Sequence, residues 1–317
     1  MNDSADAKEQ PKTDDGWGVQ GVGRSWQFRF FHFLIMIGGL RPAYHIAYVV
    51  VLWYVLFVPE VRERCGHYLR RRFPDRDGVW RRFWDSYWLV VSFARSMIDR
   101  AAYALVGRRV LRAECPDADA VLSTLEDGDG AVLLNAHIGC WQAAMNALDH
   151  TDRAVSLVMI PPEDGSPEAE LMGEDLPFDV IDPRGGTEGV MEMVSALQQG
   201  RILGLMGDRV FGVREDTVDV QFLGGTIKVP FAPYRLASVS GKPIMVLFSH
   251  KAEINRYVLR LATVIRVKAG VREPSDAEPY AQQFADVMEE YVEEHPWQFF
   301  NFYDMWGNPF CHAEDDE

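Results

Sequence analysis

Two long apolar runs near the N-terminus, at 26–40 and 43–58, are the clearest feature of the hydrophobic pattern. Arg41 and Pro42 separate them, and a proline does not continue a helix comfortably. Each run is shorter than the roughly 20 residues that a helix needs to cross a bilayer upright. Arginines flank both runs. The pattern therefore predicts an N-terminal apolar helical hairpin that lies in the membrane interface or re-enters it, with a buried pair of core helices as the alternative.

The segment 61–112 continues in a helical pattern and is rich in aromatic residues. Its large rings recur at spacings of three and four residues, which places them along one face of a helix. They are Trp80, Phe83, Trp84, Tyr87 and Trp88. We predict that this aromatic stripe belongs to the core, with a ligand-binding surface as the alternative.

From Asp117 onward, short apolar runs alternate with helical patterns, as in α/β domains. Strands are predicted at 131–136, 154–160, 178–182, 201–206, 217–222, 243–249 and 256–264, and helices at 140–148, 187–199, 231–240 and 278–294. The aromatic stretch 297–306 is expected to seal the core as a further strand. The predicted fold is α/β, with a mixed central sheet flanked by helices and preceded by the apolar helical hairpin.

The charge of the chain is strongly negative but unevenly spread. A net charge of −15 argues against a general nucleic-acid-binding protein, because phosphate contacts need a basic surface. The segment 61–112 nevertheless carries thirteen arginines and five acidic residues, a local charge of +8. Such a zone predicts an anionic partner, either a lipid surface or an acidic carrier protein, with solvated helix faces as the alternative. The four cysteines are far apart, which favours a reducing compartment, and no cleavable signal peptide is predicted.

Polar residues at the ends of predicted strands are the candidates for chemistry. His137 directly follows the strand at 131–136, and the carboxyl end of a parallel strand faces the crevice where α/β enzymes keep their active sites. Gly139 permits a tight turn after it, and Gln142, five positions on, is a candidate partner. Two further clusters, Asp182-Pro183-Arg184 and Gly207-Asp208-Arg209, contain carboxylates and cations. A histidine base with an arginine that holds a phosphate or an oxyanion suits acyl transfer.

In these motifs the sequence resembles the lysophospholipid acyltransferase superfamily, in the bacterial branch related to the late lipid A acyltransferases. The resemblance extends from about Gly21 to Trp306, and the order and spacing of the motifs carry it. The motifs are Gly23-Arg24-Ser25-Trp26, Asp182-Pro183-Arg184, Gly207-Asp208-Arg209, Phe222-Leu223-Gly224-Gly225 up to Pro230, and WQFFNFYDMW at 297–306. The resemblance implies a glycerolipid acyltransferase-like fold.

The family pattern implies a histidine that deprotonates the acceptor, followed by four residues and then an acidic residue. Gln142 occupies the acidic position here, and a neutral amide orients an imidazole without stabilising its protonated form. We therefore hypothesise that His137 pairs with Asp208, with Gln142 as a secondary orienting group; Asp304 is a weaker acidic candidate. Cys140 is interpreted as a buried, inert thiol, with an acyl-cysteine nucleophile as the alternative.

The resulting functional hypothesis is a membrane-associated acyltransferase at the cytoplasmic face of the inner membrane. It moves a fatty acyl group from acyl-ACP or acyl-CoA, used as co-substrate, to a hydroxyl or amine of a lipid or glycolipid acceptor, with no cofactor and no metal. The predicted substrate-binding residues are Arg184, Arg209, Gly139 and Trp141. Two alternatives remain open: a catalytically weakened homologue that binds lipid or acts as a scaffold, and a thioesterase- or lipase-type hydrolase.

The expected domain organisation has four parts. The chain starts with a disordered acidic tail (1–20), followed by membrane-associating helices (21–60). The acyltransferase domain covers 61–310, and a second acidic tail (311–317) ends the chain.

Overall fold

A seven-stranded sheet forms the centre of the computed structural model, which describes residues 25–125, 130–140, 151, 153–162, 178–210 and 216–307. The strand order is β1–β9–β8–β2–β5–β3–β4. The strands are β1 (Arg112–Glu114), β2 (Ala131–Asn135), β3 (Val155–Val158), β4 (Asp179–Ile181), β5 (Ile202–Met206), β8 (Ile244–Glu253) and β9 (Arg256–Ile265). The pair β8–β9 is antiparallel and every other neighbouring pair is parallel. The predicted mixed sheet of an α/β fold is therefore confirmed.

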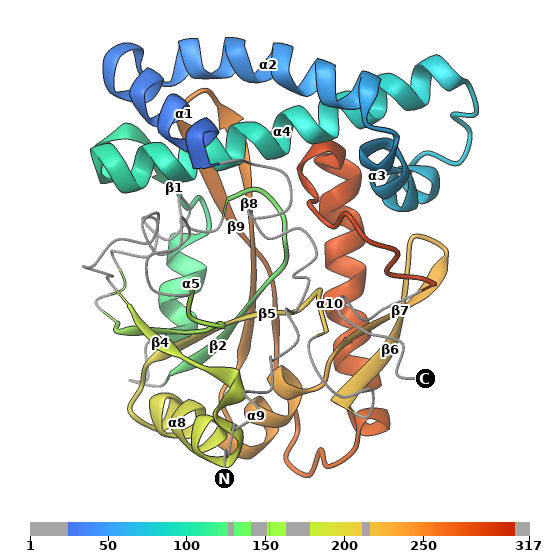
Figure 1. Ribbon diagram of the computed structural model, residues 1–317. Helices are drawn as coiled ribbons and strands as arrows, with labels where there is room; N and C mark the ends of the chain where they lie inside the picture. Colours follow the sequence, from blue (N-terminus) through green and yellow to red (C-terminus); the bar gives the residue numbers. More distant parts are fainter. Residues whose placement is uncertain are drawn as a thin grey trace, which may run out of the picture.

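Helices cover both faces of this sheet (Figure 1). One face carries α8 (Gly186–Gln198), α9 (Ala232–Ser240) and α10 (Pro274–Glu294), and the other carries α5 (Ala118–Leu125). The central strand β2 shows why both faces need cover. Its side chains alternate across the sheet: Val132 and Leu134 join the core on the α8–α10 side, whereas Ala131 and Leu133 join the core on the α5 side.

Four N-terminal helices form a layer at one end of the sheet, where α2 and α4 lie side by side in Figure 1. They are α1 (Ser25–Gly38), α2 (Leu40–Phe57), α3 (Pro59–Arg72) and α4 (Val79–Val106). The predicted break at Arg41-Pro42 is wrong by two residues. Gly39, at φ +73°, separates α1 from α2, and Pro42 lies in the first turn of α2, where a missing N–H costs no helical hydrogen bond.

Helix α2 is long and apolar enough to cross a membrane, and it is the one helix of the described residues with that length and composition. One-third of it is buried against the rest of the protein. Val51 and Val55 on its inner face belong to the same core cluster as β2. The predicted tails, 1–20 and 311–317, lie outside the described residues.

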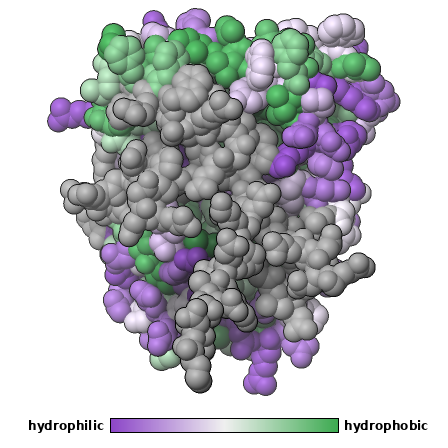
Figure 2. Space-filling model, in the orientation of Figure 1, coloured by the Kyte–Doolittle hydropathy of each residue, from purple (hydrophilic) through white to green (hydrophobic). Residues whose placement is uncertain are grey.

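The prediction that the aromatic stripe of α4 belongs to the core is right for two of its five rings and wrong for three. Tyr87 is in the core and Phe83 packs against it, whereas Trp80, Trp84 and Trp88 are 76%, 48% and 46% exposed. Exposed apolar side chains of α1 and α2, such as Ile37 and Phe57, extend the same kind of surface. Figure 2 shows hydrophobic side chains concentrated along the edge of the molecule formed by this helical layer. Spacing alone identifies one side of a helix, and here that side has three rings turned outward and two turned toward the core.

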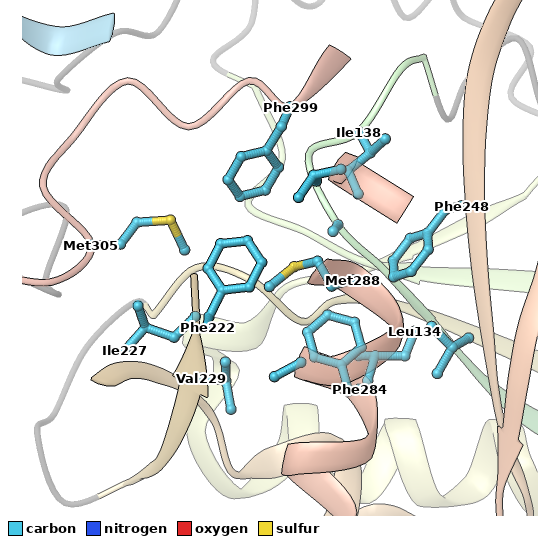
Figure 3. Packing of buried hydrophobic residues seen from close by; sticks show 14 of the residues in the cluster. Leu134, Ile138, Phe222, Ile227, Val229, Phe248, Phe284, Met288, Phe299 and Met305 are labelled. Atoms are coloured by element: carbon cyan, nitrogen blue, oxygen red, sulfur yellow. The ribbon is translucent and has the colours of Figure 1, made fainter. Parts of the chain in front are cut away.

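The hairpin of β6 (Thr217–Phe222) and β7 (Gly225–Pro230) packs beside α10 and the C-terminal segment. Figure 3 shows Phe222 and Phe299 facing each other, with Met288 of α10 and Met305 around them. The predicted strand at 297–306 is wrong. A 3-10 turn, η5 (Pro296–Gln298), is followed by a single antiparallel bridge between Ile138 and Phe299. The segment seals the core by side-chain packing and by this bridge to the loop after β2.

Candidate active site

The register of two parallel strands brings His137 and Asp208 together. Strand β2 pairs with β5 so that Asn135 lies opposite Met206, and Gly207 N donates to Asn135 O at 2.7 Å. His137 follows Asn135 by two residues and Asp208 follows Met206 by two. Neighbouring strands lie about 4.8 Å apart, so the two side chains, which follow the ends of paired strands, are close enough to form a hydrogen bond.

The carboxylate of Asp208 is hydrogen-bonded to both the backbone N–H and the imidazole ring of His137. The backbone N of His137 donates to Asp208 Oδ2 at 2.9 Å, and the ring Nδ1 lies 2.9 Å from Oδ1 and 3.1 Å from Oδ2. Since a carboxylate accepts, this geometry places the ring proton on Nδ1 and leaves the lone pair of Nε2 available. The Asp208 side chain is fully buried, whereas the His137 side chain is 28% exposed and so can be reached by a substrate.

The electrostatics of the pair favour a carboxylate beside a neutral imidazole. Burial alone raises the pKa of Asp208, but the contacts with His137 and the charge of Arg209 outweigh it and bring that pKa to about 2. Burial lowers the pKa of His137, the nearby Arg209 cation lowers it further, and Asp208 offsets these effects only in part. At neutral pH, His137 is therefore an uncharged base next to an ionised carboxylate.

Asn301 fixes the Asp208 carboxylate from the other side, and it is itself bonded to Arg209. Asn301 Nδ2 donates to Asp208 Oδ2 at 2.7 Å, and Asn301 Oδ1 accepts from Arg209 Nε at 2.6 Å. Arg209 also donates to Phe300 O at 2.8 Å, and the Tyr303 hydroxyl donates to the backbone carbonyl of Asp208 at 3.3 Å. Arg209 was predicted to bind substrate. In the structure these two of its guanidinium nitrogens donate to residues of the C-terminal segment.

Gly139 makes the turn after His137 possible. Its φ is +65°, and a Cβ built there would lie 2.3 Å from Ser249 O on β8. The loop is also tied to the C-terminal segment: Gly139 N donates to Gln298 O at 2.9 Å, and Phe300 N donates to His137 O at 2.7 Å. The bond between Ser249 Oγ and Ile138 O, 3.2 Å long, joins the loop to β8. The loop that carries His137 is therefore hydrogen-bonded to β8, to the C-terminal segment and to Asp208.

The other predicted residues fall outside this cluster. Arg184 is exposed and forms a fork with Asp182 after β4, with β3 and β5 between β4 and β2 in the sheet. Asp304 lies 3.6 Å from His67 Nδ1 and accepts from the backbone of Trp306. Cys140 is buried in the core beside the N-terminal helices. Gln142 and Trp141, together with the predicted helix 140–148 beyond Cys140, lie outside the described residues.

Asn301 and Gln298 are not among the predicted site residues. Both belong to the WQFFNFYDMW motif at 297–306, in which only Asp304 was a candidate for chemistry. An amide side chain inside an aromatic motif was the available signal, because a buried amide needs polar partners. Metal ligation has no candidate cluster of His, Cys, Asp and Glu side chains within the described ranges.

Comparison with known proteins extends this picture. A search of curated proteins found no match. Among solved structures, the 1-acyl-sn-glycerophosphate (LPA) acyltransferase PlsC from Thermotoga maritima aligns with 12% identity and a TM-score of 0.36, over 78% of this chain and 97% of that chain. The family model of the bacterial lipid A biosynthesis acyltransferases matches residues 90–307, more than half of the chain and including the His137 and Asp208 strands. The chain belongs to the bacterial lipid A biosynthesis acyltransferase family, as the resemblance in its sequence predicted.

Proposed function

We propose that this protein transfers a fatty acyl group from a thioester donor to a hydroxyl or amine of a lipid or glycolipid, with His137 as general base. The observation that carries the proposal is the pairing of His137 Nδ1 with the buried carboxylate of Asp208. Family membership supports acyl transfer to a lipid as the reaction class. Asp208 supplies the negative charge that Gln142 lacks, which favours an active enzyme over a scaffold.

The reaction follows from the orientation of the imidazole. Nε2 removes the proton from the acceptor O–H or N–H as that atom attacks the thioester carbonyl carbon. The resulting oxyanion collapses, the C–S bond breaks, and the new ester or amide forms. His137 returns its proton to the leaving thiolate, which departs as the free thiol of ACP or CoA. Asp208 stabilises the transient imidazolium throughout these steps.

The helical layer supports a membrane location for this chemistry. Exposed apolar residues on α1, α2 and α4 form a surface that a bilayer can cover, and α2 packs on the protein along one side. We propose that α1 and α2 lie in the interface of the inner membrane, at its cytoplasmic face, where lipid acceptors and acyl thioesters meet. Arg184, on the same sheet edge as His137, is proposed to bind an anionic group of one of these substrates.

The test is a reconstituted transfer assay. The purified full-length protein is mixed with palmitoyl-CoA or palmitoyl-ACP and a total bacterial lipid extract, and the products are identified by mass spectrometry. We expect one lipid class to gain an acyl chain with the wild type and not with His137→Ala. Transfer that survives His137→Ala would contradict the proposed base. Release of free fatty acid by the wild type, with no acylated lipid, would favour the hydrolase instead.

A further inference from the structure

A groove between α3 and α4 lies at the N-terminal end of α4, whereas the loop that carries His137 contacts α4 further along, at Ser96. Two adjoining cavities, of about 470 and 380 Å³, share Arg76, Trp80 and Asp85 in their walls. Ser96 of α4 donates to Gly139 O beside His137, and Asp85 precedes Ser96 by eleven residues. At 1.5 Å per residue, the groove is roughly 16 Å along the helix from that contact. It is a separate feature from the catalytic pair.

The groove is strongly cationic. Five arginines line the two cavities, against two acidic residues, Glu63 and Asp85: they are Arg62, Arg70, Arg76, Arg81 and Arg82. Three of the five have protein partners. Arg62 donates to the carbonyls of Val55 and Leu56, Arg76 pairs with Asp85, and Arg82 pairs with Asp77.

The other two arginines, Arg70 and Arg81, are both exposed. Within the described part of the chain, no carboxylate pairs with either of them. The groove therefore keeps a net positive charge even with Glu63 in its wall, and this charge would attract an anionic group from solution or from a membrane.

The walls of the groove combine this charge with exposed tryptophan. Trp80 and Trp84 line the first cavity, and Trp88 continues the stripe one turn further along α4. Tryptophan, like tyrosine, favours the headgroup level of a bilayer. Helices α1 and α2 of the same layer also expose apolar side chains, such as Ile37 and Phe57. A soluble anion or an acidic protein would require the charge but not these exposed indole rings.

We propose that the α3–α4 groove binds the phosphodiester headgroup of an anionic membrane phospholipid, with Arg70 and Arg81 as its cationic contacts and Trp80 and Trp84 beside the glycerol. Because the groove lies roughly 16 Å along α4 from the contact with the His137 loop, this lipid is proposed as a second lipid and not as the acyl acceptor. It orients the helical layer on anionic regions of the membrane. The inference rests on the membrane association proposed above and is independent of the role of His137.

The test measures binding of the full-length protein to vesicles by flotation. Neutral vesicles of phosphatidylcholine report membrane association itself, and vesicles with about one-third phosphatidylglycerol report the added effect of the anionic headgroup. We expect tighter binding to the anionic vesicles and a loss of roughly 25-fold in that affinity for the double variant Arg70→Gln/Arg81→Gln, since each arginine near the surface contributes about fivefold. Binding of that variant to neutral vesicles is expected to be unchanged.

A matched control removes the same charge elsewhere. Arg266 and Arg272 are exposed and lie beyond the end of β9 that is remote from the helical layer. The Arg266→Gln/Arg272→Gln variant is expected to keep the wild-type preference for anionic vesicles. His137→Ala is expected to keep it as well, whatever its effect on acyl transfer.

Four outcomes would overturn the proposal. Equal binding of the wild type to both kinds of vesicle would leave membrane association in place and exclude the headgroup site. Binding to neither kind would contradict both the membrane association and the headgroup site. If inorganic phosphate abolished the preference for anionic vesicles, and chloride at the same ionic strength did not, the groove would be assigned to a soluble anion. If the Arg70→Gln/Arg81→Gln variant no longer bound acyl carrier protein but still bound vesicles like the wild type, the groove would be a protein-docking site.

Discussion

Asn301 donates to Asp208 Oδ2 at 2.7 Å, although 93 positions of the chain separate the two residues. The same amide accepts from Arg209, so its oxygen faces a cation and its nitrogen faces a carboxylate. The side chains of Asn301 and Asp208 are both buried. Asn301 therefore fixes the carboxylate that orients His137, and it acts as a positioning residue.

The first prediction concerns the charge of Asp208. Asp208→Asn is expected to lower kcat/KM by about 10²–10⁴-fold, because a neutral amide cannot stabilise the imidazolium and can donate to Nδ1, which shifts the ring to the wrong tautomer. Steady-state acyl transfer measures this. Asp304→Asn is the matched control, since Asp304 lies in the C-terminal segment away from His137, and its activity should stay within about twofold. Wild-type rates for Asp208→Asn would exclude the pair.

The second prediction separates the donor of Asn301 from its shape. Asn301→Ala is expected to lower kcat/KM by about 10–100-fold, because a hydrogen bond to a charged group is lost. Asn301→Asp should be worse, since it places a second carboxylate against Asp208. In Asn301→Ala the less stabilised carboxylate should also raise the pKa of His137 and move the acid limb of the pH–rate profile upward. Unchanged profiles in both variants would contradict a positioning role.

The third prediction is the pH dependence of the reaction. The pKa of His137 is lowered by burial and by Arg209, so the base is neutral at pH 7. The rate should be flat around neutral pH and fall only below the ordinary histidine pKa of about 6.5, where the imidazole takes up a proton. Arg209→Gln removes one of the lowering influences, so its acid limb should lie at higher pH. A limb that moves downward would show that the sign of this interaction is wrong.

The fourth prediction concerns the turn at Gly139. Gly139→Ala is expected to destabilise the protein by at least about 2 kcal/mol, because a positive φ and a Cβ 2.3 Å from Ser249 O both oppose the change. Gly241→Ala provides the comparison, with φ +71° and no atom near the added Cβ. Urea unfolding of both variants isolates the steric part. Equal losses would mean that the close approach to β8 has no energetic weight.

The fifth prediction concerns a buried charge cluster that ties the helical layer to the sheet. Asp99 of α4 accepts from Lys251 of β8, Tyr257 of β9 and Tyr44 of α2, and all four side chains are buried or nearly so. Asp99→Ala leaves the Lys251 ammonium without its partner and is expected to cost about 3–5 kcal/mol in the free energy of unfolding.

A double variant tests the origin of that cost. Asp99→Leu/Lys251→Met removes both charges and should be less destabilised than Asp99→Ala, because no unpaired ion stays buried. Thermal or urea unfolding measures both variants. A double variant at least as unstable as Asp99→Ala would show that the cost arises from packing and not from the unpaired charge.

Local sequence patterns determined most of the elements of this fold. The apolar run at 131–135 becomes β2, and the alternation in 217–222 becomes β6. Strand periodicity acts over a few residues, so it is readable without tertiary contacts. The family motifs were also readable, because their order along the chain survives in the sequence itself.

Tertiary structure alone decided which face of a helix is covered and which strand ends meet. Trp80 and Trp84 satisfy the same spacing whether the stripe faces the core or the outside, and the packing of α2 and α3 on α4 left these two rings exposed. Likewise, His137 and Asp208 were each recognisable as polar residues after a strand. Their hydrogen bond depends on β5 being inserted next to β2, although β3 and β4 lie between them in the sequence, and on Asn301 arriving from the far end of the chain. Sheet order is set by packing over long distances, which no local pattern of residues records.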